Sequence, residues 1–349
     1  MIKVFDNVKV QAVASYLPEK VFEMSSLYER FGEHYMKNAM KATGVERVRI
    51  AEPDVTSSDM CYEAAKFLLD KEGVDKSEID GLIMNSQTHD YILPPTAVIL
   101  QDRLGLSRDI IAQDMNFGCS GYVLSLLQAA VWISSGLCGK VLVLNGETIT
   151  RRVNPEDRAS VVLFGEAGSA TLMTKGEGSI AFKVYTDGSG WDKLYIPAGL
   201  FRMPASEKTK DLVYDANGNG RALEDMYMDG EAIFSFVISK VPGEIKELLS
   251  AVKWTKDEVG LFAFHQPNEI MIKFLAKLMK VPSEKMPVNV KNYGNTSSTS
   301  IHLLLTDLLP GEGDCNLDKV VLSGFGVGLS IASAALDMSG TRFYPPLNK

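Results

Sequence analysis

The sequence predicts an α/β fold with two similar halves, because one strand–turn–helix–strand unit occurs twice along the chain. The turn Asn-Phe-Gly-Cys-Ser at 116–120 recurs as Asn-Tyr-Gly-Asn-Thr at 292–296, and each copy opens a long apolar stretch. A hydrophobic run precedes each turn, and a strand-like segment beginning with Lys-Val follows each apolar stretch. Strands that alternate with helices form layered folds in which helices cover sheets. We expect two βαβ-type halves, residues 1–175 and 176–349, with a catalytic site between them.

Apolar periodicity assigns the elements of the first half. Ser57-Ser58-Asp59 provides caps for one helix, and Gly105 ends another. The uniformly apolar run at 79–85 is typical of a strand that is buried on both faces. The predicted strands are 4–16, 79–85, 140–146 and 169–173, with 110–114 leading into the first turn. The predicted helices are 25–42, 57–71 and 96–104, followed by the uncharged stretch after Cys119.

The second half begins with the least regular part of the chain, from 187 to 229, which shows little periodicity. A segment of this length is either a functional lid or partner-contact loop, or a solvated insertion. Regular elements then resume. We expect helices at 230–249, 269–280 and 296–309, strands at 259–264 and 319–323, and an apolar helix after the glycine-rich loop at 324–328.

The bulk composition narrows the functional classes. Apolar residues make up 46% of the 349 residues, and the net charge of −8 argues against a general nucleic-acid binder. The histidines lack metal-ligand spacing, so no metal is expected. The cysteines form no CxxC motif and the start of the chain has no signal-peptide pattern, which favours a reducing cytoplasm. The cysteines are Cys61, Cys119, Cys138 and Cys315.

One uncharged segment, 116–139, is long enough to suggest a membrane span. It contains several Ser and Gly residues and a Gln, however, and a helix that is apolar on all faces also suits the centre of a large soluble core. We therefore expect no membrane association.

Cys119 lies where the uncharged helix is predicted to begin. A thiol at a helix N-terminus meets the positive end of the helix dipole, which favours the reactive thiolate. The alternative is a buried structural cysteine, which is the usual fate of a free thiol.

Two further polar residues follow predicted strands or turns. His265 ends the strand at 259–264, at the strand end where α/β folds place their sites, although a satisfied core imidazole is the alternative. Asn295 occupies a Gly-Asn-Thr-Ser turn and has a purely conformational alternative. Taken together, Cys119, His265 and Asn295 supply a nucleophile, a proton-handling base and an amide donor, which predicts a thiolate-based acyl-transfer site.

The loop Gly-Phe-Gly-Val-Gly at 324–328 has two interpretations. It resembles a phosphate-binding loop, but the chain ends soon afterwards and offers no complete βαβ unit with the required acidic residue. Glycines also allow backbone N–H groups to approach a reacting atom, and this suits an oxyanion hole.

The chain resembles β-ketoacyl-acyl carrier protein synthase III, a condensing enzyme of the thiolase-like fold with αβαβα layers. The resemblance covers nearly the whole length. It rests, in order, on KATGVERVRIAEPDVTSSDM, the Cys119 segment, GETITRRVNPEDRASVVLFGEAGSA, MDGEAIFSFVISKVP, FHQPN, NYGNTSSTSI and GFGVGLS.

The resemblance implies a role for each matching residue. Cys119 is the acylated nucleophile, and His265 and Asn295 assist the decarboxylation of a malonyl thioester. The N–H groups of Cys119 and Val327 form the oxyanion hole. The expected contacts with the substrate or coenzyme A come from Arg158, Asn268 and Leu93; of these, Leu93 closes the acyl pocket of a partner subunit, which implies a homodimer. No cofactor is expected, because acyl-coenzyme A or acyl-carrier thioesters carry the activation.

The chain also departs from the family. Asn38 and Ala42 replace a Trp and an Arg that stack on coenzyme A, and Ile270 replaces an Arg that helps to dock the carrier. Pro267, Val327 and Ile331 replace an Ala, a Gly and a Trp. The chemistry is therefore expected to be intact, whereas the use of coenzyme A as primer donor is open.

The expected partner is an acyl carrier protein. Lys273, Lys277 and Lys280 share one face of the helix after His265, and two acidic proteins need such a basic patch to meet. A solvated helix face is the alternative. Two other functions stay open: a specialised acyltransferase or polyketide-type condensing enzyme of the same fold, and a non-catalytic protein that binds acyl carriers.

Overall fold

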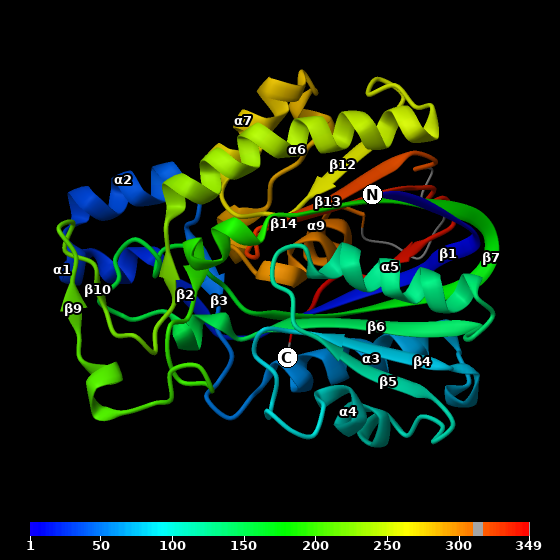
Figure 1. Ribbon diagram of the computed structural model, residues 1–349, viewed down its shortest axis with the longest axis horizontal. Coiled ribbons are helices and arrows are strands. Elements are labelled where there is room, and N and C mark those ends of the chain that lie inside the picture. Colours follow the sequence, from blue (N-terminus) through cyan, green and yellow to red (C-terminus); the bar gives the residue numbers. More distant parts are fainter. Residues whose placement is uncertain (310–316, 349) are drawn as a thin grey trace.

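The computed structural model describes residues 1–309 and 317–348. Its secondary-structure elements stack in the predicted αβαβα order (Figure 1). The outer helices on one side are α6 (Gly230–Val252) and α7 (Glu269–Met279), and those on the other side are α3 (Ser57–Glu72) and α4 (Thr96–Leu104). The middle layer holds α5 (Gly121–Ser134) and α9 (Ser300–Leu308).

The strands of both β layers belong to one continuous mixed sheet, because β7 runs through both layers. The strand order is β12-β13-β14-β7-β6-β4-β5. The sheet strands are β12 (Leu261–Phe264), β13 (Val320–Gly326), β14 (Ser330–Leu336), β7 (Ala167–Thr186), β6 (Lys140–Glu147), β4 (Gly81–Asn85) and β5 (Ile111–Met115), with β1 (Ile2–Leu17) beside β7. Strands β4, β5 and β6 are parallel, as are β12 and β13.

Strand β7 connects the two halves. Its residues 167–174 pair with β6, whereas its residues 180–186 pair with β14. The boundary that we predicted between 175 and 176 therefore falls inside this strand, just before its pairing partner changes. The sequence predicted only 169–173, because the stretch 175–179 is polar, rich in glycine and mostly exposed. Pairing with β1 carries the strand through this stretch.

The segment after the glycine-rich loop is a correction. We expected an apolar helix, but residues 330–336 form β14, which pairs antiparallel with both β13 and β7. Every residue of β14 is buried. A fully buried strand has no polar face, so its sequence cannot be distinguished by periodicity from a buried helix.

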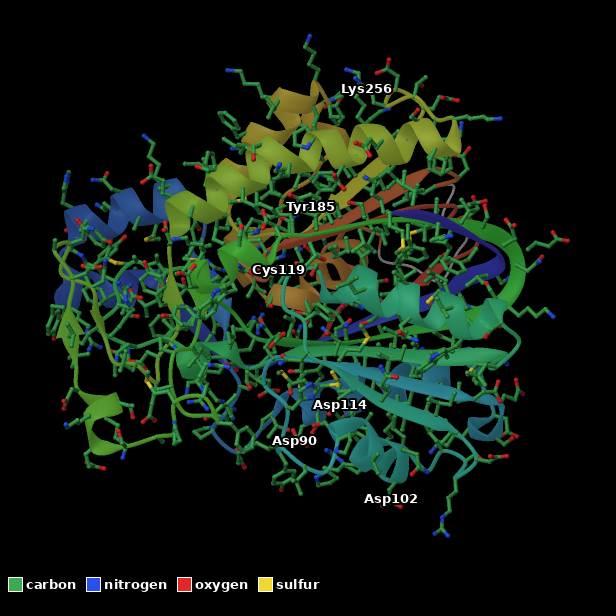
Figure 2. The ribbon with its side chains drawn as sticks, in the orientation of Figure 1. Asp90, Asp102, Asp114, Cys119, Tyr185 and Lys256 are labelled. Atoms are coloured by element: carbon green, nitrogen blue, oxygen red, sulfur yellow. The ribbon has the colours of Figure 1, made fainter. Side chains whose placement is uncertain are left out.

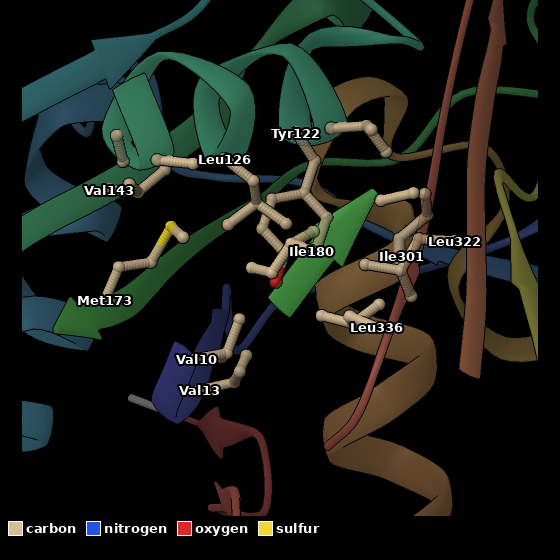
Figure 3. Packing of buried hydrophobic residues seen from close by; sticks show 14 of the residues in the cluster. Val10, Val13, Tyr122, Leu126, Val143, Met173, Ile180, Ile301, Leu322 and Leu336 are labelled. Atoms are coloured by element: carbon tan, nitrogen blue, oxygen red, sulfur yellow. The ribbon is translucent and has the colours of Figure 1, made fainter. Parts of the chain in front are cut away.

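The middle layer explains the uncharged segment. Tyr122 and Leu126 of α5 pack against Ile180 and Met173 of β7 and against Ile301 of α9 in one buried cluster (Figure 3). Because α5 lies between the two arms of the sheet, most of its circumference meets apolar side chains, and only the stripe that includes Leu124, Gln128 and Val131 is partly exposed. Within the described ranges, no helix is both long and apolar enough to cross a membrane.

Short elements complete the described chain. The predicted helix 25–42 is broken at Gly32, whose φ of +86° suits glycine, into α1 (Tyr28–Phe31) and α2 (Glu33–Thr43). The remaining short pieces are β2 (Val21–Glu23), β3 (Arg47–Arg49), α8 (Val290–Tyr293), β15 (Arg342–Phe343) and β16 (Leu347–Asn348). The irregular segment 187–229 forms 3₁₀ turns and the two-residue strands β8 (Leu194–Tyr195), β9 (Val213–Tyr214), β10 (Gly220–Arg221) and β11 (Tyr227–Met228).

Candidate active site

Cys119 lies where α5 begins, near the centre of the molecule (Figure 2). Its turn is fixed from β4: the Asn85 Nδ2 donates to the Phe117 carbonyl at 2.9 Å, and the Phe117 N–H donates to Asn85 Oδ1 at 3.0 Å. Gly121 allows this approach, since a Cβ there would lie 2.2 Å from Asn85 Nδ2. The nucleophile turn is thus held against the end of a central strand.

The glycine-rich loop closes over the other side of Cys119. A Cβ on Gly326 would lie 3.0 Å from Cys119 Sγ, and one on Gly324 would lie 2.4 Å from the Cys119 carbonyl oxygen. The backbone of Val327 forms a hydrogen bond with the thiol. The predicted neighbours Cys119 and Val327 therefore lie next to each other.

Cys119 does not behave as its position alone suggested. The residue is only 8% exposed, and burial raises the pKa of the thiol to about 11. The carboxyl group of Glu147 also raises this pKa, whereas hydrogen bonds from Val327 and from the Ser297 hydroxyl lower it. The helix N-terminus is present, but burial shifts the thiol pKa upward, and this shift favours the protonated thiol.

His265 ends β12 and is held by two elements of the second half. Its backbone N–H donates to the Ser323 carbonyl of β13 at 2.8 Å, and its Nδ1 lies 2.7 Å from the Ser300 hydroxyl of α9. The Ser300 hydroxyl also accepts from the Gln266 N–H at 3.3 Å. A ring N–H of His265 also donates to the Ser297 carbonyl, and this raises the pKa of the imidazole.

Burial lowers the pKa of His265 to about 3. The imidazole is therefore neutral across the physiological range. A neutral imidazole brings one N–H donor and one acceptor nitrogen rather than a second positive charge.

Asn295 lies in the turn between α8 and α9. Its backbone is fixed by the Leu163 carbonyl, which accepts at 2.7 Å, and by the Gly165 N–H, which donates to the Asn295 carbonyl at 3.1 Å. Its Oδ1 accepts from the Ser297 N–H at 2.9 Å. Among the described residues, no protein acceptor engages its Nδ2, and this leaves the amide N–H groups for a substrate.

Ser297 connects the three predicted residues, and the sequence did not single it out. It contacts Asn295 through its N–H, Cys119 through its hydroxyl, and His265 through its backbone. Cys119, His265 and Asn295 therefore all lie next to Ser297.

Glu147 is a second residue that the sequence reading missed. It ends β6, is fully buried, and accepts hydrogen bonds from the Gln87 N–H, the Thr88 hydroxyl and the Ser298 hydroxyl, each at 3.3 Å. Burial raises its pKa to about 8. A signal was present, because an acidic residue ends an apolar strand on the sheet edge that carries the other polar groups.

Three predicted contact residues have roles of their own in the protein. Arg158 stacks on the Tyr35 ring, with 4.4 Å from its Cζ to the ring centroid, and donates to the Asn217 carbonyl. Asn268 caps α7, because its Oδ1 accepts from the Met271 N–H at 2.8 Å. Leu93 is 78% exposed on the loop after β4, as a residue for contact with a partner subunit would be.

The predicted docking lysines lie on the exposed face of α7. The side chain of Lys273 is 65% exposed and pairs with Glu269 at 2.6 Å, and Lys277 is exposed one turn further along. The Lys280 backbone ends the helix in the left-handed region.

Comparison with known proteins identifies the class to which this site belongs. Residues 113–188 match the family described as 3-Oxoacyl-[acyl-carrier-protein (ACP)] synthase III, and residues 249–338 match its C-terminal part. A beta-ketoacyl-[acyl-carrier-protein] synthase III of Clostridium perfringens is 32% identical over 95% of this chain and 100% of its own. One from Caldanaerobacter subterraneus is 30% identical, with 95% and 97% covered.

Solved structures agree with this assignment. A 3-oxoacyl-(acyl-carrier protein) synthase from Burkholderia xenovorans superposes with a TM-score of 0.93 at 34% identity, covering 100% of this chain and 99% of its own. The priming β-ketosynthase of the R1128 polyketide pathway has a TM-score of 0.80 at 28% identity, with 96% and 98% covered. The fold is the predicted thiolase-like fold. The chain belongs to the 3-oxoacyl-[acyl-carrier-protein] synthase III family, and it is a condensing enzyme of the acyltransferase class.

Proposed function

We propose that Cys119 accepts an acyl group from a thioester and then passes it to a carbanion formed by decarboxylation of a malonyl thioester. In the first step, the Cys119 thiol gives its proton to a base in the site, and the sulfur attacks the thioester carbonyl. The N–H groups of Cys119 and Val327 stabilise the oxyanion, and the donor thiolate leaves and takes a proton from solvent. The observation that carries this proposal is the contact between the Val327 backbone and the Cys119 thiol in a buried site.

The second step uses His265 and Asn295. The neutral His265 ring and the free Asn295 amide donate to the carbonyl oxygen of the malonyl thioester, where negative charge develops as carbon dioxide leaves. The carbanion then attacks the acyl-cysteine carbonyl, the new carbon–carbon bond forms, and the Cys119 thiolate is released. Two neutral donors suit this step, because they gain strength only as the oxyanion forms.

Variants of the site residues separate the two steps. Cys119→Ser should abolish acyl labelling, as followed by mass spectrometry of the intact protein with small acyl thioesters. Asn295→Ala should still become acylated but release carbon dioxide from malonyl thioester roughly 10²–10³ times more slowly, the usual cost of losing one oxyanion donor. A Cys119→Ser enzyme that condenses at the wild-type rate would refute the mechanism. A wild-type protein that never acquires an acyl group would support the non-catalytic carrier-binding alternative.

The partner in this proposal is an acyl carrier protein that docks on α7. Lys273→Glu combined with Lys277→Glu should weaken the use of carrier-bound thioester, chiefly at low salt, while a small soluble thioester is used as before. Lys37→Glu provides a matched control, since Lys37 is 62% exposed on α2 and has the same i,i+4 pairing with a glutamate. Equal losses in both variants would remove the docking role from α7.

A homodimer, a cytoplasmic location and the absence of a cofactor complete the proposal. Exposed Leu93, with Tyr91 and Ile92 beside it at 63% and 69% exposure, supports a contact between subunits. Arg158 and Asn268 remain proposed substrate contacts, and binding of coenzyme A would require Arg158 to leave Asn217.

A second candidate is the priming of a polyketide rather than of a fatty acid. It is supported by the 28% identity with the R1128 priming ketosynthase. A panel of acyl primers and carriers, with acyl-Cys119 formation as the readout, distinguishes the two functions.

A further inference from the structure

Ser297 is held in a conformation that side chains rarely adopt. Its φ is +53°, in the left-handed region, and the residue is only 4% exposed. Such a conformation costs of order 1–3 kcal/mol and persists where the surroundings impose it, typically at functional sites. Here the Asn295 side chain fixes the Ser297 N–H, and the turn directs the Ser297 hydroxyl into the site.

The Ser297 hydroxyl lies between two titratable groups. It lies close enough to the Cys119 thiol on one side and to the Glu147 carboxyl on the other to lower the pKa of both groups. The adjacent Ser298 hydroxyl donates to Glu147 Oε1 as well, so the turn is joined to the end of β6 at two successive residues. The Ser297 hydroxyl therefore lies between Sγ and a buried carboxyl group.

Glu147 forms no ion pair with a cationic side chain among the described residues. Its hydrogen bonds come from the neutral Gln87 N–H, Thr88 and Ser298, and among the described residues no Lys, Arg or His pairs with it. A fully buried carboxyl group without a cation lowers the stability of the fold. Proteins retain such groups chiefly at functional sites. The other titratable groups that face this region are the thiol of Cys61 on α3 and, beyond it, the Asp90 carboxyl.

We propose that Glu147, acting through the Ser297 hydroxyl, takes the proton of the Cys119 thiol when the cysteine attacks the acyl donor. The S–H bond breaks, Ser297 Oγ receives that proton, and the hydroxyl proton of Ser297 passes to the Glu147 carboxylate. When condensation later releases the Cys119 thiolate, the proton returns by the same route. This inference rests on the proposed role of Cys119 as the nucleophile.

The pKa values of the groups in the site agree with such a base. The thiol has a pKa of about 11 and is protonated at neutral pH, and His265, with a pKa of about 3 and Nδ1 bound to Ser300, is a weak proton acceptor. The carboxyl group of Glu147, with a pKa near 8, is matched to a neutral operating pH.

A simpler role for Glu147 makes the opposite prediction. If the carboxylate acted only as a nearby negative charge, it would raise the pKa of Cys119, and replacing it by a neutral amide would speed acylation. If it accepts the proton, the same replacement slows acylation by roughly 10²-fold, the lower range for general base catalysis.

The test measures single-turnover acylation of Cys119 by a small acyl thioester, with intact-protein mass spectrometry, between pH 6 and 10. In the wild-type enzyme the rate should rise with pH and level off near pH 8, as Glu147 loses its proton. Glu147→Gln should be slower and lose this inflection. Ser297→Gly, which tolerates the positive φ and keeps Glu147 in place, should show the same loss.

Controls separate this role from a structural one. Glu166→Gln alters another fully buried carboxyl, which accepts from the Ala51 N–H at 2.7 Å and from Thr150, and it should leave the pH profile unchanged. A Glu147→Gln enzyme whose Cys119 has been acylated chemically should still release carbon dioxide from malonyl thioester, because the decarboxylation step uses His265 and Asn295.

Each result has a defined meaning. Faster acylation in Glu147→Gln, or an unchanged rate and profile in both variants, overturns the relay while leaving Cys119 as the nucleophile. Loss of the pH inflection on replacing His265 but not Glu147 would assign the base to His265 and would equally overturn it. Failure of the wild-type enzyme to acylate Cys119 at all would instead refute the proposed function.

Discussion

Asn85 is expected to determine where the nucleophile lies, and Asn85→Ala tests this. The side chain is fully buried and makes two hydrogen bonds with the Phe117 backbone, two residues before Cys119. Each such bond contributes about 1 kcal/mol net, so the loss of both should lower the free energy of unfolding by about 2 kcal/mol. The turn is also released, and a misplacement of about 1 Å can slow a reaction about 10²-fold. Acylation of Cys119 should therefore fall more than the stability loss alone would explain.

The chain offers a matched control on the neighbouring strand. Asn145 of β6 is the register partner of Asn85 in β4 and is equally buried, but neither polar atom of its side chain has a hydrogen-bond partner among the described residues. Asn145→Ala should therefore change stability by less than about 1 kcal/mol, because removing an unsatisfied amide offsets the small cavity. Urea unfolding and single-turnover acylation measure both effects. Equal changes in the two variants would refute the positioning role.

Three further expectations concern other parts of the molecule. Iodoacetamide should alkylate Cys119 faster than the fully buried Cys61, as peptide mapping can show. At pH values below the raised pKa of Cys119, the alkylation rate should increase about tenfold per pH unit, because only the thiolate reacts. Leu93→Asp should dissociate the proposed homodimer in analytical ultracentrifugation, whereas Val213→Asp, at a comparably exposed site, should not. Burial favours a higher pKa for Glu72, but hydrogen bonds, of which the one from Arg342 is the largest, outweigh burial and lower the pKa. The Glu72 carboxylate therefore stabilises the fold fully above its pKa in the unfolded chain, about 4.3. This stabilisation is lost as the pH falls through the lower pKa of the folded protein. Glu72→Gln should thus reduce stability by about 1–3 kcal/mol at pH 7 and by little near pH 3, as urea titrations at both pH values would show.

The sequence predicted the parts of the site that depend on local order along the chain. Cys119, His265 and Asn295 each directly follow or precede a strongly patterned strand or helix, and parallel strands bring such ends to one edge. For the same reason the layered fold followed from the duplicated unit, whereas the length of β7 did not. Its exposed middle resembles a turn, and only pairing with β1 makes it a strand.

Contacts between distant segments were beyond a reading of the sequence. The pKa of Cys119 depends on its burial beneath the loop at 324–328 and on Glu147, which lies far from it in the chain. The sequence analysis did not single out Ser297, whose positive φ and hydrogen bond to the Asn295 side chain appear only in the folded chain. Arg158 is held by Asn217, in the segment that showed no periodicity.

The duplicated architecture explains why the catalytic residues are divided between the halves. Both middle-layer helices, α5 and α9, begin beside the same point, so the turn before each helix faces the turn before the other. The first turn carries the thiol and the second carries the amide and the Ser297 hydroxyl, while the strand ends of the two halves supply Glu147 and His265. In the proposed mechanism, the first half thus provides the nucleophile and its proton acceptor, and the second half provides the donors to the oxyanion and the hydroxyl between them. Because the two turns meet only when β7 holds both arms of the sheet together, assembly of the fold and assembly of the site are the same event, and neither half alone should acquire an acyl group.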